Sequence, residues 1–271
     1  MANFLINAAI KGVLEGFTEF LPISSTGHLV LVRKLLPVAA AEHAERLDNL
    51  FDIIVQFPAV LAIVVLYWKR LWDSVSGFAS RPEARRFWLG IALAFIPLAA
   101  LGLVFKKKIE EHLMHPVPVA LALIVGGLVL ILIERRRHTD RVQNAEDVTP
   151  ETALIIGFFQ ALALIPGTSR SGATIVGGRL FGLSRSAAAE FSFFLAIPVM
   201  AAAFGYQMIK EYKNLQPGDG PILITGSVTS FITAYIVVAV FIKFLQKHSL
   251  AAFGWYRIAL GALVLIFASK L

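Results

Sequence analysis

Long apolar segments set the strongest limit on how this chain can fold. A helix that crosses a lipid bilayer needs about 20 mainly apolar residues. Six segments meet this requirement, at residues 51–68, 87–105, 117–133, 186–208, 221–245 and 251–268. Only 16% of the 271 residues are charged, whereas soluble domains have about 25%. The sequence therefore predicts an all-α integral membrane protein with a single membrane domain and six transmembrane helices.

Two further apolar segments, at residues 3–36 and 153–183, are interrupted near the middle by Pro, Gly and hydroxyl residues. The first break lies at residues 22–27 and the second at residues 166–172. Each half is too short to span a bilayer comfortably, so each segment is predicted to form a re-entrant helix pair. Irregular backbone is tolerated at membrane depth only inside protein or beside a water-filled cavity. Both breaks are therefore expected in the protein interior.

The order of these segments indicates an internal repeat. A broken pair and three spans occupy about residues 1–133, a polar loop covers 134–152, and a second broken pair and three spans occupy 153–271. Residues 12–27 (GVLEGFTEFLPISSTG) align without gaps to residues 157–172 (GFFQALALIPGTSRSG). Since three spans per repeat is an odd number, the second repeat is predicted to have inverted topology. In such folds the facing broken helices form the site where the repeats meet.

Basic residues in the loops predict the orientation. The loops at 69–86 and 134–152 lie on one face and contain nine Lys and Arg residues, whereas those at 106–116 and 209–220 contain five. Because cytoplasmic loops carry the excess of Lys and Arg, the first face is predicted to be cytoplasmic and both termini to lie outside. The N-terminal segment lacks a basic n-region and a cleavage site, so no signal peptide is expected. The net charge of +7 is suited to interaction with anionic lipid headgroups. The sequence has no cluster of basic and aromatic residues that would indicate nucleic-acid binding.

Two carboxylates, Glu15 and Glu19, precede the first break. Their i,i+4 spacing puts them on one helix face, about 6 Å apart. Two carboxylates this close in a protein interior repel each other unless a cation or an Arg compensates. Their oxygens suit Mg²⁺ or Ca²⁺, which commonly bridge to a phosphate. The alternative is that both side chains extend to the outer headgroup region.

Hydroxyl residues and a histidine follow the same break. Ser24, Ser25 and Thr26 can cap the second half-helix, and taken alone this is the favoured interpretation. With hydroxyls three and four residues before it, His28 can also serve as a general acid or base. The alternative for His28 is an ordinary interior histidine.

The second break has the composition of a phosphate site. Gly167 and Gly172 permit close approach of the backbone, and free N–H groups at a half-helix N-terminus attract anions. Arg170 adds a bidentate fork that matches phosphate geometry. Its polar neighbours are Ser169, Ser171 and Thr174. These residues predict a phosphate cradle, and the alternative is a plain Gly-Ser turn with an interfacial Arg170.

Four other polar residues are secondary candidates for the site. Ser184 is expected to be the N-cap of the following span, and Arg185 is expected at the membrane interface. Glu190 lies near them in the sequence. Arg257 lies in the last span, where it needs a buried partner.

Three motifs resemble the undecaprenyl-diphosphatase family of bacterial membrane phosphatases, which is associated with bacitracin resistance. They are EGFTEFLPISSTGH at 15–28, PGTSRSGAT at 166–174 and GLSRSAAAEFSFFLAIP at 182–198, and the resemblance extends over essentially the whole chain. The resemblance implies hydrolysis of undecaprenyl diphosphate to undecaprenyl phosphate, the lipid carrier of peptidoglycan precursors. It further implies an inner-membrane enzyme with two re-entrant helix pairs in an inverted repeat, a divalent cation and an active site open to the outer face.

The resemblance also assigns roles to residues. The catalytic set that it implies is Glu15, Glu19, Ser25 and His28, with Glu15 and Glu19 as cation ligands. The phosphate-binding set is Arg170, Ser24, Thr26, Ser169, Ser171 and Thr174.

Several alternatives stay open at the level of the sequence. Either Ser25 attacks the terminal phosphorus while His28 relays its proton, or His28 or a glutamate activates water for direct attack and Ser25 only hydrogen-bonds the phosphate. Phe191, Phe193 and Phe194 either line a groove for the polyprenyl tail or pack in the core. A transporter or lipid flippase is the main competing function, because inverted repeats with broken helices are a transporter architecture. The identity of the cation and the oligomeric state, including a homodimer, are not determined.

Overall fold

The computed structural model describes residues 2–33, 35–136 and 139–268 of the chain. Residue 34 of the first broken segment and residue 137 of the basic loop therefore lie outside the described part. The regular structure within it is helical apart from an isolated bridge between Val142 and Leu183. The α-helices are α1 (Ala2–Thr18), α2 (Ser25–Val32), α3 (Ala41–Ile54), α4 (Gln56–Leu66), α5 (Trp68–Ser76), α6 (Pro82–Leu113), α7 (Pro116–Arg135), α8 (Pro150–Ala161), α9 (Arg170–Leu180), α10 (Arg185–Glu211), α11 (Asp219–Leu245) and α12 (Ala251–Phe267).

Five segments of the described chain are helical, apolar and long enough to cross a membrane, at Arg46–Leu66, Pro82–Phe105, Pro116–Arg135, Arg185–Asn214 and Asp219–Leu245. They contain or closely match five of the six predicted spans. The sixth prediction, 251–268, corresponds to α12, an apolar helix of 17 residues. An all-helical membrane protein is therefore confirmed.

The first span differs in detail from the prediction. It starts earlier than residue 51, and it is divided between α3 and α4 at Val55. Pro58 has no backbone N–H, so the carbonyl of Ile54 loses its normal helical partner at this point. The short helix α5, which was expected to be loop, follows the span. It exposes the stacked rings of Trp68 and Trp72, as interfacial helices do.

The two broken segments have the same local structure. Ser24 and Ser169, which are aligned in the sequence, have φ angles of 69° and 72°. Each caps the helix that follows it, because the Ser24 Oγ accepts from the Gly27 N–H and the Ser169 Oγ from the Gly172 N–H. Residues 25–27 and 170–172 were assigned to the breaks, but they form the first turns of α2 and α9, since these caps start the helices there. Positive φ at a residue other than Gly is strained and concentrates at functional sites.

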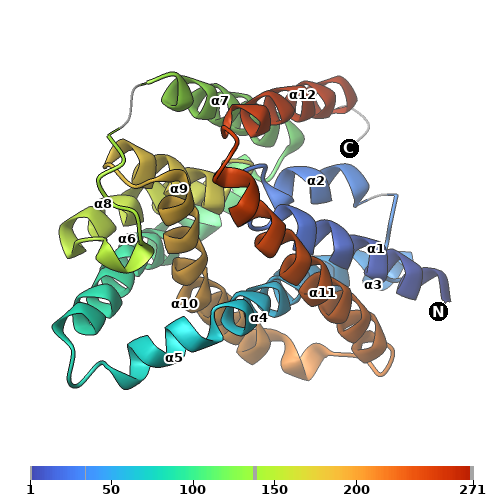
Figure 1. The fold of residues 1–271 in the computed structure, drawn as a ribbon. Coiled ribbons are helices and arrows are strands. Elements are labelled where there is room, and N and C mark those ends of the chain that lie inside the picture. The colour runs from blue at the N-terminus through green and yellow to red at the C-terminus, as the bar shows by residue number, and fades with distance from the viewer. Residues whose placement is uncertain (1, 34, 137–138, 269–271) are drawn as a thin grey trace.

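Helices from the two halves of the sequence pack against each other. Figure 1 shows α7 beside α12, and α1 packs along α11 while α8 packs along α6. Small residues allow this close approach. A Cβ on Gly157 of α8 would lie 2.6 Å from the carbonyl oxygen of Ala94 in α6, and Gly12 of α1 faces the backbone of Gly226 in α11 in the same way. Gly12 and Gly157 occupy aligned positions in the two broken segments.

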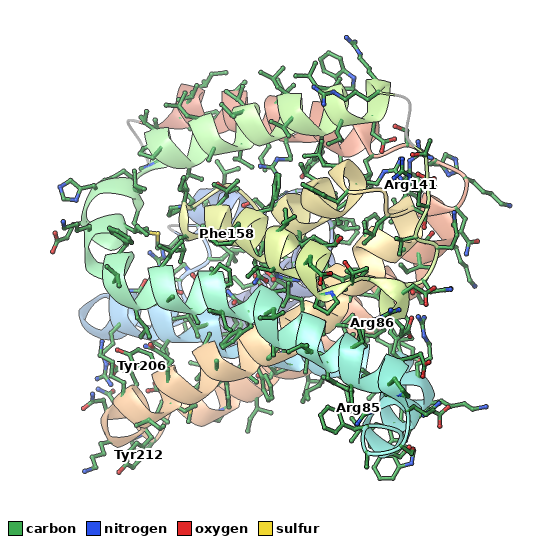
Figure 2. All side chains as sticks on the ribbon, turned by 90° about the vertical axis from the view of Figure 1, so that its left-hand side faces the viewer. Arg85, Arg86, Arg141, Phe158, Tyr206 and Tyr212 are labelled. Atoms are coloured by element: carbon green, nitrogen blue, oxygen red, sulfur yellow. The ribbon has the colours of Figure 1, made fainter. Side chains whose placement is uncertain are left out.

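The loops predicted to share one face do so. Arg70, which follows the first span, forms an ion pair of 2.7 Å with Glu146 of the central loop. In Figure 2, Arg85 and Arg141 lie at one end of the molecule, and Tyr206 lies toward the opposite end. Basic residues therefore concentrate at one end of the helices.

The aromatic run of α10 belongs to the core. Phe191, Phe193 and Phe194 are buried among other apolar side chains, and Phe193 packs edge-on against Phe20 with ring centres 5.4 Å apart. Of the two interpretations of these residues, core packing is the one that holds.

Candidate active site

A cavity of about 170 Å³ is lined by residues of both broken segments. Its walls are formed by Glu19, Ser24, Ser25, Thr26, Gln56, Ala163, Gly167, Ser169, Arg170 and Met200. The N-termini of α2 and α9 both reach this cavity, since Ser25 and Arg170 are their first residues. The fold thus brings the two predicted clusters together.

Arg170 joins the two clusters directly. Its Nη2 donates to Oε1 of Glu19 at 2.9 Å, although 151 positions separate the two residues. Its Nη1 donates to the carbonyl and the hydroxyl oxygen of Ser192, at 2.9 and 3.3 Å. Its Nε is buried and has no hydrogen-bond partner. The guanidinium therefore lines the cavity with one donor unused.

Glu19 bridges Arg170 and Ser25. The Ser25 hydroxyl donates to Oε2 of Glu19 at 2.8 Å, while the other carboxylate oxygen accepts from Arg170. Both Glu19 and Ser25 line the cavity. A hydroxyl whose proton is directed at a carboxylate has the geometry needed for activation by a general base.

Glu15 is fully buried one helical turn before Glu19, and neither of its carboxylate oxygens accepts a hydrogen bond. A buried carboxylate without partners is costly. The unused oxygens beside Glu19 fit the predicted divalent cation, because carboxylates are its preferred ligands. Among the described residues no third Asp, Glu or His completes a metal-binding group. Of the two carboxylates, Glu19 lines the cavity and Glu15 does not.

A buried ion-pair cluster continues from the site along α1. Lys11 is fully buried, and its Nζ lies 2.8 Å from Asp48 and 3.0 Å from Asp52, both on α3. Lys11 and Glu15 lie on one face of α1, and Glu19, in the turn directly after the helix, continues this face because its N–H still bonds to the Glu15 carbonyl. This cluster was not predicted from the sequence. The spacing of the three charges was its available signal, but their partners on α3 lie in a segment with no motif.

His28 lies beside the cavity without lining it. Its Nδ1 is 2.7 Å from the carbonyl oxygen of Ser24, and its Nε2 is 2.7 Å from the hydroxyl of Tyr256 on α12. The Ser25 hydroxyl is directed at Glu19, so the direct Ser25–His28 contact on which the predicted proton relay depends is not formed in this structure. The contact of Tyr256 with His28 was not predicted, although Tyr256 directly precedes Arg257, a secondary candidate for the site.

The hydroxyls of the second break have structural partners. The Ser169 and Ser171 hydroxyls are 3.0 Å apart, and Ser171 donates to the carbonyl of Leu21 in the first break at 2.8 Å. Thr174 lies 2.7 Å from Ser192 Oγ. Ser169 is the member of this group that lines the cavity, while Ser171 and Thr174 are buried behind it. Ser192, a fully buried serine within an apolar span, was not recognised from the sequence.

Arg257 binds backbone carbonyls of both breaks. Its guanidinium donates to Pro22 at 3.3 Å and to Gly167 and Thr168 at 3.1 and 2.8 Å. Two carbonyls of α7 complete its contacts. Broken helices at membrane depth leave carbonyls that need such donors. Arg257 therefore stabilises the geometry of the two breaks.

The remaining secondary candidates lie away from the cavity. Ser184 caps α10, as predicted, by accepting from the Ala187 N–H at 3.2 Å. Arg185 forms an ion pair of 2.7 Å with Glu134. Glu190 accepts from Arg70 at 3.0 Å. These contacts tie α10 to the loop end of the bundle rather than to the predicted site.

The sequence matches that of a known family over most of its length. The sequence model described as bacitracin resistance protein BacA matches residues 8–263. An undecaprenyl-diphosphatase of Nitrosospira multiformis is 49% identical over 97% of this chain and 95% of its own length. One of Pseudomonas putida is 50% identical over 95% of this chain and 92% of its own. Undecaprenyl-diphosphatase 2 of Rhodospirillum rubrum is 49% identical over 96% and 94%. The chain therefore belongs to the bacitracin resistance protein BacA family.

Proposed function

We propose that this protein hydrolyses undecaprenyl diphosphate to undecaprenyl phosphate and inorganic phosphate, which recycles the lipid carrier of peptidoglycan precursors and confers bacitracin resistance. Its relatives named undecaprenyl-diphosphatase support the proposal. The observation that carries it is the Arg170–Glu19–Ser25 chain at the cavity between the two breaks. In this chain a base, Glu19, lies within hydrogen-bond distance of both a phosphate-binding Arg170 and the Ser25 hydroxyl.

We infer the finer architecture from the packing. In this arrangement α12 is the sixth span, α1–α2 and α8–α9 are re-entrant pairs, and the two halves form an inverted repeat. The pairing of α1 with α11 and of α8 with α6 supports this arrangement, because each broken segment packs on a span of the other half. The protein lies in the bacterial inner membrane. Its basic end faces the cytoplasm and its cavity opens to the outer face.

In the proposed mechanism, the diphosphate enters the cavity and binds Arg170 together with the backbone N–H groups at the starts of α2 and α9. Helix N-termini favour anions, and an Arg fork matches phosphate oxygens. Hydroxyls of Ser24, Thr26 and Ser169 add donors to the phosphates. Phosphoryl transfer depends mainly on such positioning and charge stabilisation.

Glu15 and Glu19 would hold a divalent cation, Mg²⁺ or Ca²⁺, which supplies positive charge next to the phosphate oxygens. Lys11 and its two aspartates on α3 act behind this pair and hold the charged face of α1 in place. Tyr256 orients His28, which in turn holds the start of α2 through the Ser24 carbonyl. His28 is thus a positioning residue in this scheme.

The bond-forming step follows from the hydrogen bond between Ser25 and Glu19. The Ser25 Oγ attacks the terminal phosphorus, its proton passes to Glu19, and the bond to the bridging oxygen breaks. Undecaprenyl phosphate leaves, and water then hydrolyses the phosphoserine to release phosphate. In the alternative scheme Glu19 takes a proton from water, the water oxygen attacks the terminal phosphorus, and the bond to the bridging oxygen breaks. Undecaprenyl phosphate leaves, and Ser25 only donates a hydrogen bond to the phosphate.

Purified protein in detergent tests the function. With Mg²⁺ or Ca²⁺ present it should release phosphate from undecaprenyl diphosphate, and a chelator should abolish the release. A lipid flippase, the main competing function, would move the lipid across vesicle membranes without releasing phosphate. Absence of phosphate release with any divalent cation would contradict the proposal.

Ser192 provides a prediction for a residue behind the site. Ser192→Ala should lower kcat/KM by about 10- to 150-fold, because losing a hydrogen bond to a charged group costs about 1.5–3 kcal/mol and each 1.36 kcal/mol is a factor of ten. The affected groups are Arg170 and Thr174, which both contact the Ser192 hydroxyl. The measurement is steady-state phosphate release.

Ser230→Ala is the matched control, since Ser230 is equally buried and its hydroxyl donates to the Val55 carbonyl instead. It should keep nearly normal kcat/KM. Equal losses in the two variants would indicate that Ser192 contributes only to stability.

A further inference from the structure

A second cavity, of about 360 Å³, lies where α4, α10 and α11 meet. Its walls include Phe57, Pro58, Phe204, Met208, Leu223 and Ile224, and no charged side chain lines it. Phe57 and Phe204 stack with ring centres 4.7 Å apart. We call this cavity the α10 groove. Its surface is suited to a hydrocarbon ligand and not to a headgroup.

The groove neighbours the cavity between the breaks, because α10 and α4 contribute residues to both. Met200 lines the first cavity, and Phe204 and Met208 line the groove. These three residues are each four apart on α10, so they form one stripe about 12 Å long. On α4, Gln56 lines the first cavity and the adjacent Phe57 lines the groove. α10 and α4 therefore each contribute neighbouring residues to the two cavities.

The groove is also open toward the surrounding lipid. Ile224 is 65% exposed and Val228 is 51% exposed, and both line it from α11. In Figure 1, α10, α4 and the N-terminal part of α11 converge on the side of the molecule away from α7 and α12. A hydrocarbon chain that follows the stripe from Met200 to Met208 on α10 would thus pass apolar side chains on its way to the exposed Ile224 and Val228.

We propose that the α10 groove binds the first isoprene units of the substrate's polyprenyl chain while its diphosphate occupies the cavity between the breaks. The assignment rests on the proposed function, which supplies a lipid diphosphate. Burial of apolar surface contributes about 25 cal/mol per Å², so the groove adds affinity for the long chain. A stripe of about 12 Å accommodates only part of the chain, and the remainder stays in the bilayer.

Gly220 allows the groove to be filled without disturbing the core. It lines the groove, and a Cβ at this position would meet no heavy atom within 4 Å. Gly205 on α10 has the same free space but does not line the groove. Gly220→Trp should therefore raise KM for undecaprenyl diphosphate about tenfold relative to Gly205→Trp. It should leave kcat/KM for isopentenyl diphosphate, a five-carbon substrate that cannot reach the groove, unchanged.

Ser227→Leu is a second groove variant in case Gly220→Trp folds poorly, and thermal unfolding of both is compared with that of Gly205→Trp. An unchanged KM for undecaprenyl diphosphate in the groove variants would overturn the assignment. Equal losses for the long and the short substrate would also overturn it. If the wild-type protein hydrolyses neither substrate, the proposed function itself fails, and this outcome is distinct from failure of the groove.

Discussion

Replacing Arg170 with Ala is expected to lower kcat/KM for undecaprenyl diphosphate by about three orders of magnitude. An arginine that stabilises the charge of the transferring phosphoryl group contributes about 10³–10⁵ to the rate of such reactions, and the low end of this range is expected for a single Arg in this cavity. Arg170 lies on the cavity wall, contacts Glu19 at 2.9 Å and has an unused Nε donor. Steady-state phosphate release in detergent measures the effect.

The Arg170→Lys variant distinguishes the effect of positive charge from the effect of the bidentate guanidinium geometry. Lys keeps the positive charge but cannot make two parallel hydrogen bonds to a phosphate, so its kcat/KM should lie well below that of the wild-type protein. Arg185→Lys is the control, because Arg185 pairs with Glu134 away from the cavity. Normal activity of the Arg170→Lys variant would contradict bidentate binding of the phosphate by Arg170.

Ser25→Ala is expected to lower kcat by about four orders of magnitude or more, as removal of a catalytic nucleophile does in well-studied hydrolases. Its hydroxyl donates to Glu19 at 2.8 Å, at the start of α2 and on the cavity wall. If water attacks directly, the variant loses only one hydrogen bond, and kcat should fall about tenfold. The size of the loss therefore distinguishes the two schemes.

Acid quenching with labelled substrate gives the direct evidence for the covalent scheme. Labelled phosphate should be found on Ser25 in the wild-type protein and be absent in Ser25→Ala. Thr26→Val is the control, since Thr26 contributes another hydroxyl to the same cavity. It should lose activity about tenfold at most and still form the labelled intermediate. Substantial activity in Ser25→Ala would exclude Ser25 as the nucleophile.

The sequence predicted much of the fold because apolar length and helix breakers are local signals. The five long spans and both breaks lie close to their expected positions. The division of the first span near Val55 was missed, although Pro58 provided a local signal for it. The helix α5 was missed because a short amphipathic segment with charges at 69–73 is typical of a loop as well as of an interfacial helix.

The site was predicted less completely, since spacing identifies which residues share a face but not which residue meets them from another helix. The pairing of Arg170 with Glu19 agrees with the inference that the breaks face each other. The roles of Ser192 and Tyr256 were not predicted, because both lie in apolar spans whose sequence does not indicate a polar partner. The need of Arg257 for a buried partner was recognised, but its partners are backbone carbonyls, which no motif marks.

The central claim is that one diphosphate-binding cavity lies between the two broken segments. It is tested most directly by cross-linking in membranes, because the chain has no cysteine. Thr26→Cys and Ala163→Cys place one thiol from each segment on the cavity wall. We expect a short bifunctional thiol reagent to link them efficiently, and undecaprenyl diphosphate to suppress the link. If the pair fails to link while Phe57→Cys with Phe204→Cys does, or if the substrate has no effect, the shared cavity is contradicted.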